Sequence, residues 1–253
     1  MAYRFYQMAH IPEPCQGEWY AGRAGGKSNM TFAEHVLKFY RSLDLSKTRL
    51  PKGVEVLNPY RDSSALDLTE KFFRKFYSDN NQRKIIIGIN PGRFGGGTTG
   101  IPFTDPIRLE NICGIPSGLA KKPELSSDFI YRMIEAYGGA EKFYSDYFIS
   151  SASPLGFTKD GKNLNYYDIR ELQSALESFI ITSLREQIGF GISTGVAFCL
   201  GEGDNFKNLN IWNKKEELFK EIIPLPHPRF IMQYRRKRLD EFIELYTGKL
   251  SQY

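Results

Sequence analysis

Two side chains suited to chemistry follow apolar strands in this sequence. Asn90 stands where an apolar run meets a loop with six glycines between residues 88 and 100. His227 is held between two prolines at the end of a later apolar run. An amide is not basic near neutral pH, so Asn90 could orient a water molecule but not remove its proton. An imidazole can donate a hydrogen bond to developing negative charge, but an isolated histidine is about as often a hydrogen-bonded core or surface residue, so at this point the two residues mark a candidate site and not a reaction.

Both residues are expected at the carboxyl ends of parallel strands, where open α/β sheets place their sites. Periodicity predicts strands at 84–89, 147–151, 196–200 and 221–225, and helices at 31–43, 66–77, 128–137, 168–187 and 234–246. Strands that alternate with helices predict an α/β fold, a three-layer α/β/α sandwich around a central four-stranded parallel sheet. Asn90 and His227 should therefore face one crevice.

Length and charge limit the kinds of protein that fit. The 253 residues contain no linker or repeat, so we expect a single domain spanning residues 1–253. The balance of 34 Lys and Arg against 29 Asp and Glu gives a net charge of +5. This excess permits a polyanionic partner without requiring one. No coiled-coil seam is evident, so a monomer is expected.

The cysteines argue against a metal centre. Cys15, Cys113 and Cys199 lie far apart, so they form neither a zinc knuckle nor a disulfide framework, and they cannot supply four ligands to an iron–sulfur cluster. The first residues do not resemble a signal peptide, and no apolar run reaches membrane-spanning length. We expect a soluble cytoplasmic protein.

Three familiar motifs match the sequence without their required context. Residues 95–100 fit GxGxxG, but Pro102 and Pro106 oppose the helix that a dinucleotide would need. Residues 92–99 have phosphate-loop spacing, yet Thr98 stands where the phosphate-binding lysine belongs. Residues 191–195 fit GxSxG between a helix and a strand, the reverse of the order in a nucleophile elbow, so Ser193 is expected in a turn.

The segment 88–103, GINPGRFGGGTTGIPF, resembles the first motif of the single-strand-selective monofunctional uracil-DNA glycosylases. Three further blocks agree in order with that family: VLNPY at 56–60, FISSASPL at 148–155 with GKNL at 161–164, and LPHPR at 225–229. The collinear resemblance covers residues 55 to 245 and implies the fold of the uracil-DNA glycosylase superfamily, with removal of a base from DNA as the reaction.

The resemblance also implies roles for individual residues. Asn90 would position the attacking water, and His227 would donate a hydrogen bond to the base oxygen that becomes negative. Phe103 would stack on the extruded base, Ile89 would contact it through its backbone, and Gly92 would leave room beside it. No lysine occupies the two crevice motifs, residues 88–103 and 225–229, which argues against a Schiff base and strand cleavage, so hydrolysis alone is expected.

A base in a duplex must be unstacked, at a cost of a few kcal/mol, before such a site can reach it. In the family, the loop after the second-motif histidine enters the DNA. Here that loop and the basic run behind it give the expected DNA contacts, which are Arg229, Phe230, Arg235 and Arg236.

Two departures from the family pattern bear on specificity. Ser151 stands where the family has an asparagine that reads the uracil edge, and the second motif is shortened. A hydroxyl offers fewer paired contacts than an amide, which weakens discrimination among bases. The sequence therefore indicates a divergent branch acting on uracil and on other deaminated bases such as xanthine or hypoxanthine.

The resulting expectation is a monofunctional DNA glycosylase that leaves an abasic site in base excision repair and uses no metal or organic cofactor. Two other functions are compatible with the same residues. One is a nucleic-acid-binding module that keeps the crevice but lacks the chemistry, and the other is hydrolysis of a small nucleoside. Salt distinguishes the latter, because DNA binding weakens with salt and nucleoside binding does not.

Overall fold

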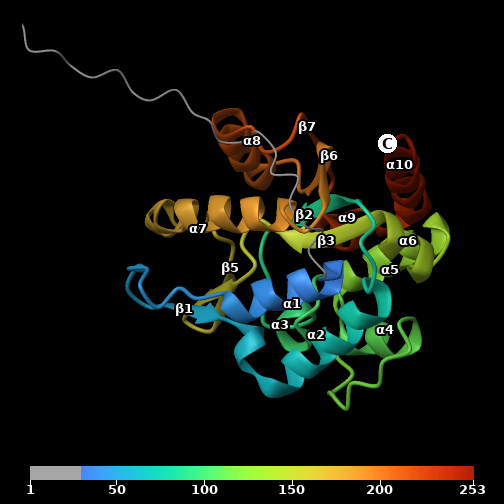
Figure 1. The fold of residues 1–253 in the computed structure, drawn as a ribbon, viewed down its shortest axis with the longest axis horizontal. Helices are drawn as coiled ribbons and strands as arrows, with labels where there is room; N and C mark the ends of the chain where they lie inside the picture. Colours follow the sequence, from blue (N-terminus) through green and yellow to red (C-terminus); the bar gives the residue numbers. More distant parts are fainter. Residues whose placement is uncertain (1–29) are drawn as a thin grey trace, which may run out of the picture.

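The structure is a computed structural model that describes residues 30–253. Its centre is a four-stranded sheet in the order β3-β2-β6-β7, with all neighbours parallel (Figure 1). The strands are β2 (Arg83–Gly88), β3 (Tyr147–Ser151), β6 (Ile192–Leu200) and β7 (Glu221–Leu225). The predicted α/β fold with a four-stranded parallel sheet is confirmed. Cys15 and the N-terminal segment used to judge a signal peptide lie outside the described residues.

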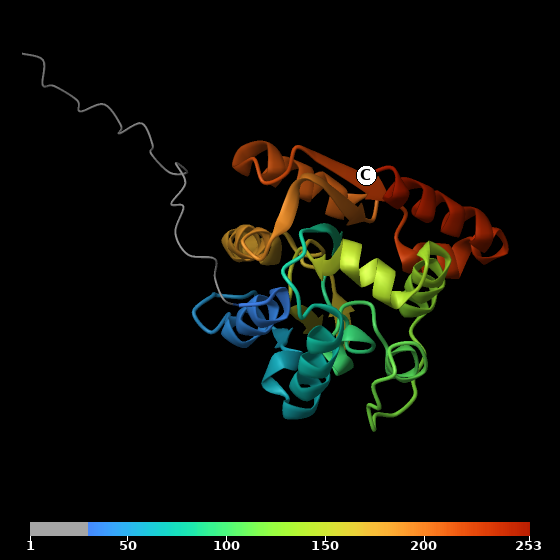
Figure 2. The same ribbon diagram turned by 45° about the vertical axis from the view of Figure 1, so that its right-hand side comes forward.

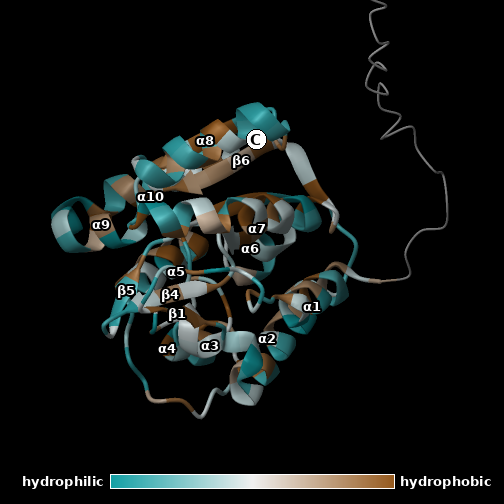
Figure 3. Cartoon of the chain, turned by 90° about the vertical axis from the view of Figure 1, so that its left-hand side faces the viewer, coloured by the Kyte–Doolittle hydropathy of each residue, from teal (hydrophilic) through white to brown (hydrophobic). Residues whose placement is uncertain are grey.

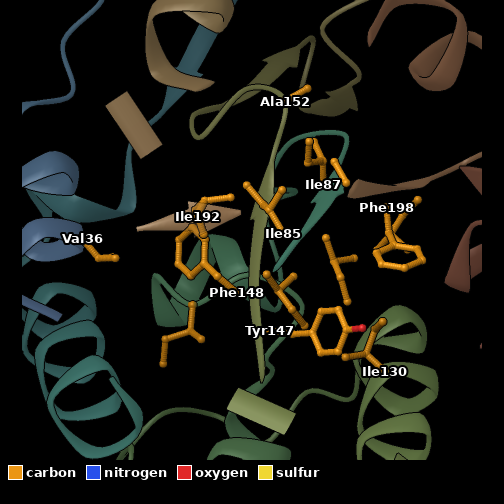
Figure 4. Close-up of a cluster of buried hydrophobic side chains, with 14 of the residues drawn as sticks. Val36, Ile85, Ile87, Ile130, Tyr147, Phe148, Ala152, Ile192 and Phe198 are labelled. Carbon is orange, nitrogen blue, oxygen red and sulfur yellow. The ribbon is translucent and has the colours of Figure 1, made fainter. Parts of the chain in front are cut away.

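Helices cover both faces of this sheet (Figure 2). Their bounds are α1 Phe32–Ser42, α2 Ser63–Phe76, α3 Gly96–Thr99, α4 Pro106–Asn111, α5 Leu125–Tyr137, α6 Ala140–Asp146, α7 Arg170–Ile188, α8 Asp204–Glu216, α9 Pro228–Tyr234 and α10 Leu239–Ser251. Two successive residues of β3 point to the opposite faces of the sheet and identify the helices on each. The Phe148 ring packs on Phe32 of α1, whereas the Tyr147 hydroxyl donates to the Leu250 carbonyl in α10. Figure 4 shows the same division, with Phe148 near Val36 and Tyr147 near Ile130.

The strand sequences are apolar because the sheet is covered on both sides. Ile85, Ile86 and Ile87 of β2 are fully buried, and the last five residues of β6 are also buried. The hydrophobic colouring of β6 in Figure 3 matches this position. Fully buried parallel strands need apolar side chains on both faces, so polar side chains are confined to the strand ends. Among residues 30–253, no helix combines the length and the apolar character needed to cross a membrane.

A second, antiparallel sheet was not predicted. It contains β1 (Val54–Leu57), β4 (Gly156–Lys159) and β5 (Lys162–Leu164) in the order β1-β4-β5. The strands are short, but their hairpin carries a recognisable signal. Asp160 and Gly161 both have positive φ, 48° and 68°, and Asp-Gly is a preferred pair for a two-residue hairpin turn. This hairpin brings residues 163–165 to the carboxyl end of the central sheet.

The predicted helix 234–246 is wrong in its start. The structure has α9, then a 3-10 turn at Arg236–Arg238, then α10. His227 caps α9 and Pro228 occupies its first turn, so the helix begins within the second motif. The basic residues therefore lie in a corner between two helices. Ser193 is a further correction: β6 begins at Ile192, so this residue lies in the strand and not in a turn.

Candidate active site

A cavity of about 430 Å³ opens at the carboxyl ends of the central strands. The loops after β2, β3 and β7 line it together with the β4–β5 hairpin and α9. Eight of the ten predicted site residues contribute to its lining: Ile89, Asn90, Gly92, Phe103, Ser151, His227, Arg229 and Phe230. The volume lies within the range of small-molecule sites and accommodates a nucleobase.

Backbone groups fix the Asn90 side chain at both ends of its amide. Its Nδ2 donates to the carbonyls of Leu164 at 3.0 Å and Pro91 at 3.2 Å, and its Oδ1 accepts from the Tyr166 N–H at 2.9 Å. Both amide hydrogens are therefore used, while one lone pair of Oδ1 remains free. Toward the cavity Asn90 can only accept a hydrogen bond, which suits the orientation of a water molecule.

Phe103 occupies space that Gly88 leaves at the end of β2. A Cβ on Gly88 would lie 2.6 Å from Cε2 of the Phe103 ring, so only glycine fits there. Phe103 itself has a φ of 54°, a conformation that bulky residues rarely adopt and that costs about 1–3 kcal/mol. The strain is retained where the ring forms a wall of the cavity, which points to a function for the ring.

His227 lies beside this wall, its ring centroid 6.2 Å from that of Phe103. Its Nδ1 accepts a hydrogen bond from the Arg229 N–H at 3.1 Å and thereby caps α9. Burial and the nearby Arg229 charge lower the pKa of His227 to about 4. The imidazole is therefore neutral near pH 7, and because Nδ1 is an acceptor, Nε2 must carry the proton. The ring offers one N–H donor.

The backbone around His227 is held from two sides. The buried Tyr246 hydroxyl of α10 donates to the Pro226 carbonyl, and the Gly201 N–H donates to the Leu225 carbonyl at 2.8 Å. The carbonyls of the two residues before His227 are thus both bonded. This arrangement orients the imidazole before any ligand binds.

Ser151 ends β3 directly beside Gly88 in the sheet register. It is 5% exposed and lines the cavity, and its hydroxyl forms no hydrogen bond within residues 30–253. Its neighbour Ser150 instead donates to Gln187 in α7. Of these two serine hydroxyls, that of Ser151 is therefore the one available to a ligand.

Comparison with known proteins assigns the chain to a family. Residues 74–250 match the model of the uracil DNA glycosylase superfamily. This chain belongs to that superfamily. The crystal structure of wild-type SMUG2 from Pedobacter heparinus is similar to it, with a TM-score of 0.86 and 45% sequence identity over 88% of this chain and 98% of that chain. A search of curated proteins gave no match.

Gly92 and Ile89, the two residues of this superfamily member predicted to lie against the base, also have contacts within the protein. A Cβ on Gly92 would lie 2.9 Å from the Asn163 Nδ2, so the glycine first makes room for this amide. The Ile89 carbonyl accepts from the Ser153 N–H at 3.1 Å and keeps one lone pair. Contact of either residue with a base stays a prediction.

The predicted DNA-binding residues fall into two groups. Arg229 and Phe230 lie at the cavity, whereas Arg235 and Arg236 are exposed beyond it and do not line it. Arg235 is nevertheless linked to the rim, because its guanidinium lies 5.3 Å from the Phe230 ring centroid. Within residues 30–253, no group of three or more His, Cys, Asp or Glu side chains could hold a metal ion.

Tyr166 and Asn205 help to position the site of this superfamily member, and the sequence analysis did not predict them. The Tyr166 hydroxyl donates to Asn205 Oδ1 at 3.0 Å, and Asn205 Nδ2 donates to the Gly88 carbonyl at 3.3 Å. Since the Tyr166 N–H also holds Asn90, this network joins Asn90 to the end of β2. Tyr166 and Asn205 carry no motif of their own, so only the fold reveals their position.

Tyr166→Phe should weaken this network. Tyr166 and Asn205 are both buried, so the lost hydroxyl leaves Asn205 Oδ1 without its donor, which should cost about 1–3 kcal/mol of unfolding free energy. Urea unfolding measures this loss. Tyr167→Phe is the matched control, because the Tyr167 hydroxyl forms no hydrogen bond within residues 30–253. Equal stability of the two variants would contradict the network.

Proposed function

We propose that this chain is a monofunctional DNA glycosylase that hydrolyses the N-glycosidic bond of uracil and other deaminated bases, leaving an abasic site for base excision repair. One observation carries the proposal. Asn90 and His227, which are distant in the sequence, line one cavity, each with its hydrogen bonding already fixed. Membership of the superfamily supports the same reaction.

The geometry suits the charges that this reaction develops. As the glycosidic bond breaks, positive charge grows on the sugar and negative charge on the departing base. The neutral His227 would donate a hydrogen bond from its Nε2–H to the base oxygen that becomes negative. The imidazole does not have to be protonated first to act as this donor. Phe103 would stack on the base and fix its plane.

Asn90 would act on the other reactant. Its free Oδ1 lone pair would accept a hydrogen bond from water and turn a water lone pair toward the sugar carbon. The cationic sugar is reactive enough for a weak nucleophile, so orientation replaces base catalysis. In the described part of the chain, the cavity lining contains no lysine. The lining thus supports hydrolysis without a Schiff base or strand cleavage.

Ser151 would set a broad base range, and a lesion panel tests this. We expect excision of uracil together with xanthine or hypoxanthine from single-lesion oligonucleotides, because one hydroxyl can serve as donor or acceptor. Ser151→Asn should raise the preference for uracil over xanthine by about tenfold or more. The introduced amide would pair with the edge of uracil, but against xanthine it would be left buried with unsatisfied hydrogen-bonding groups. Single-turnover rates on each oligonucleotide give the ratio.

Ser151→Ala is the matched variant for that experiment. It removes the hydroxyl without adding an amide, so it should slow excision of every base and leave their ranking unchanged. Strict uracil selectivity of the unmodified protein would refute the broad range. Failure to excise any lesion, with DNA binding retained, would refute the glycosylase and favour a binding module.

A further inference from the structure

An exposed aromatic ring with two cations lies at the mouth of the cavity. Phe94 lines the cavity yet is 48% exposed. The Arg93 guanidinium lies 5.6 Å from its ring centroid, and the Lys122 ammonium lies 5.4 Å from it. Neither cation forms an ion pair with any of residues 30–253, whereas the neighbouring Lys121 is paired with Glu110. We call Phe94, Arg93 and Lys122 the Phe94 cluster.

The loop that carries the cluster is held in place. The Arg93 N–H donates to Asn163 Oδ1 at 3.1 Å, which ties the loop to the β4–β5 hairpin. A Cβ on Gly97 would lie 1.8 Å from the Gly92 carbonyl oxygen, so the chain closes on itself at a point where only glycine fits. The exposed ring of Phe94 is thus presented by a packed loop and is not the tip of a loose one.

The cluster has a counterpart on α9. Phe230 and Tyr234 also line the cavity, are 42% and 66% exposed, and lie 5.6 Å apart by ring centroids. Arg235 covers the Phe230 ring. The cavity mouth therefore has exposed aromatic rings with cations on two separate elements. Exposed aromatic faces combined with unpaired cations are suited to single-stranded nucleic acid, which offers bases for stacking and phosphates for charge pairing.

We propose that the Phe94 cluster binds the DNA strand beside the extruded nucleotide, with Phe94 stacked on a neighbouring base and Arg93 and Lys122 on its phosphates. The inference rests on the proposed function and adds a strand contact that the second motif does not provide. Stacking on Phe94 requires a base with a free face, so the contact favours an unpaired strand over an intact duplex. The α9 aromatics would hold the strand on the other part of the mouth.

Binding without catalysis tests the cluster. Fluorescence anisotropy would measure the affinity for a single-stranded oligonucleotide that carries a tetrahydrofuran abasic analogue. Phe94→Ala should weaken this binding by about 10- to 100-fold, the loss of one stacked base. Phe94→Trp should retain it. Ile211→Ala is the control, because Ile211 is 54% exposed on α8 and does not line the cavity.

The cations are tested by salt. Arg93→Gln with Lys122→Gln should reduce the slope of log affinity against log salt by about 1.4, which is two phosphate contacts on a single strand. An unchanged slope, or equal affinity of Phe94→Ala and the unmodified protein, would overturn the cluster. These readouts need no base excision. If the protein excises lesions and Phe94→Ala does not change its affinity for the abasic oligonucleotide, the cluster alone is refuted. If Phe94→Ala weakens binding but the protein excises no lesion, the proposed function alone is refuted.

Discussion

Replacing Asn90 by alanine should slow base excision by about 10²- to 10⁴-fold, because the attacking water loses the group that orients it. Binding to an abasic oligonucleotide should change little, since the amide hydrogens of Asn90 face protein carbonyls and only one Oδ1 lone pair is free. Single-turnover excision of uracil measures the first effect, and anisotropy measures the second. A variant with unchanged turnover would remove Asn90 from the mechanism.

Asn90→Asp is the sharper companion variant. A carboxylate is more basic than an amide, but here one of its oxygens would face the carbonyls of Leu164 and Pro91, which now accept from Nδ2. The folded state should therefore favour the protonated acid, and the variant should gain thermal stability as pH falls from 7 to 5. It should excise more slowly than the unmodified protein at pH 7. Faster excision would show that a base, and not an oriented acceptor, limits the reaction.

His227→Asn should lower the single-turnover rate by about 10²- to 10³-fold, the usual effect of losing one donor to a developing anion. Asparagine is a good helix cap, so the variant keeps the cap on α9 and removes the imidazole donor. Circular dichroism melting would check that the fold survives. A rate within a few-fold of the unmodified protein would show that the base oxygen finds another donor.

The pH dependence follows from the same residue. With a pKa of about 4 the imidazole stays neutral from pH 9 down to about 5, so the excision rate should show no His227 titration in that range. Below about pH 4 a protonated Nδ1 can no longer accept from the Arg229 N–H. The folded pKa is lower than the unfolded value near 6.5, so the contribution of His227 to stability is complete above pH 6.5 and is lost as pH falls to 4. An excision rate that rises as pH falls, with a midpoint near pH 6.5, would contradict a neutral donor.

The residues that sequence reasoning located are those whose signal is local. Asn90 follows an apolar strand and precedes glycines, and His227 stands between prolines, so each was recognisable from its immediate neighbours. Parallel strands then required the two to share an edge of the sheet. The cavity that both line agrees with this requirement.

The residues that were missed depend on contacts between distant segments. Tyr166 and Asn205 acquire their roles only when the β4–β5 hairpin and α8 pack on the end of β2. The positive φ of Phe103 and the packing of its ring against Gly88 likewise could not be read from its residue type. The hairpin could have been found, because Asp160 and Gly161 are a known turn pair. The start of α9 could also have been anticipated from Pro228.

The most direct test is a crystal structure of the Asn90→Ala variant with a single-stranded oligonucleotide that contains deoxyuridine. We predict an intact nucleotide with its uracil against the Phe103 ring, its oxygen within hydrogen-bond distance of His227 Nε2, and its sugar carbon facing the place of the missing amide. A uracil bound away from this cavity, or one whose glycosidic bond does not lie between residues 90 and 227, would contradict the account.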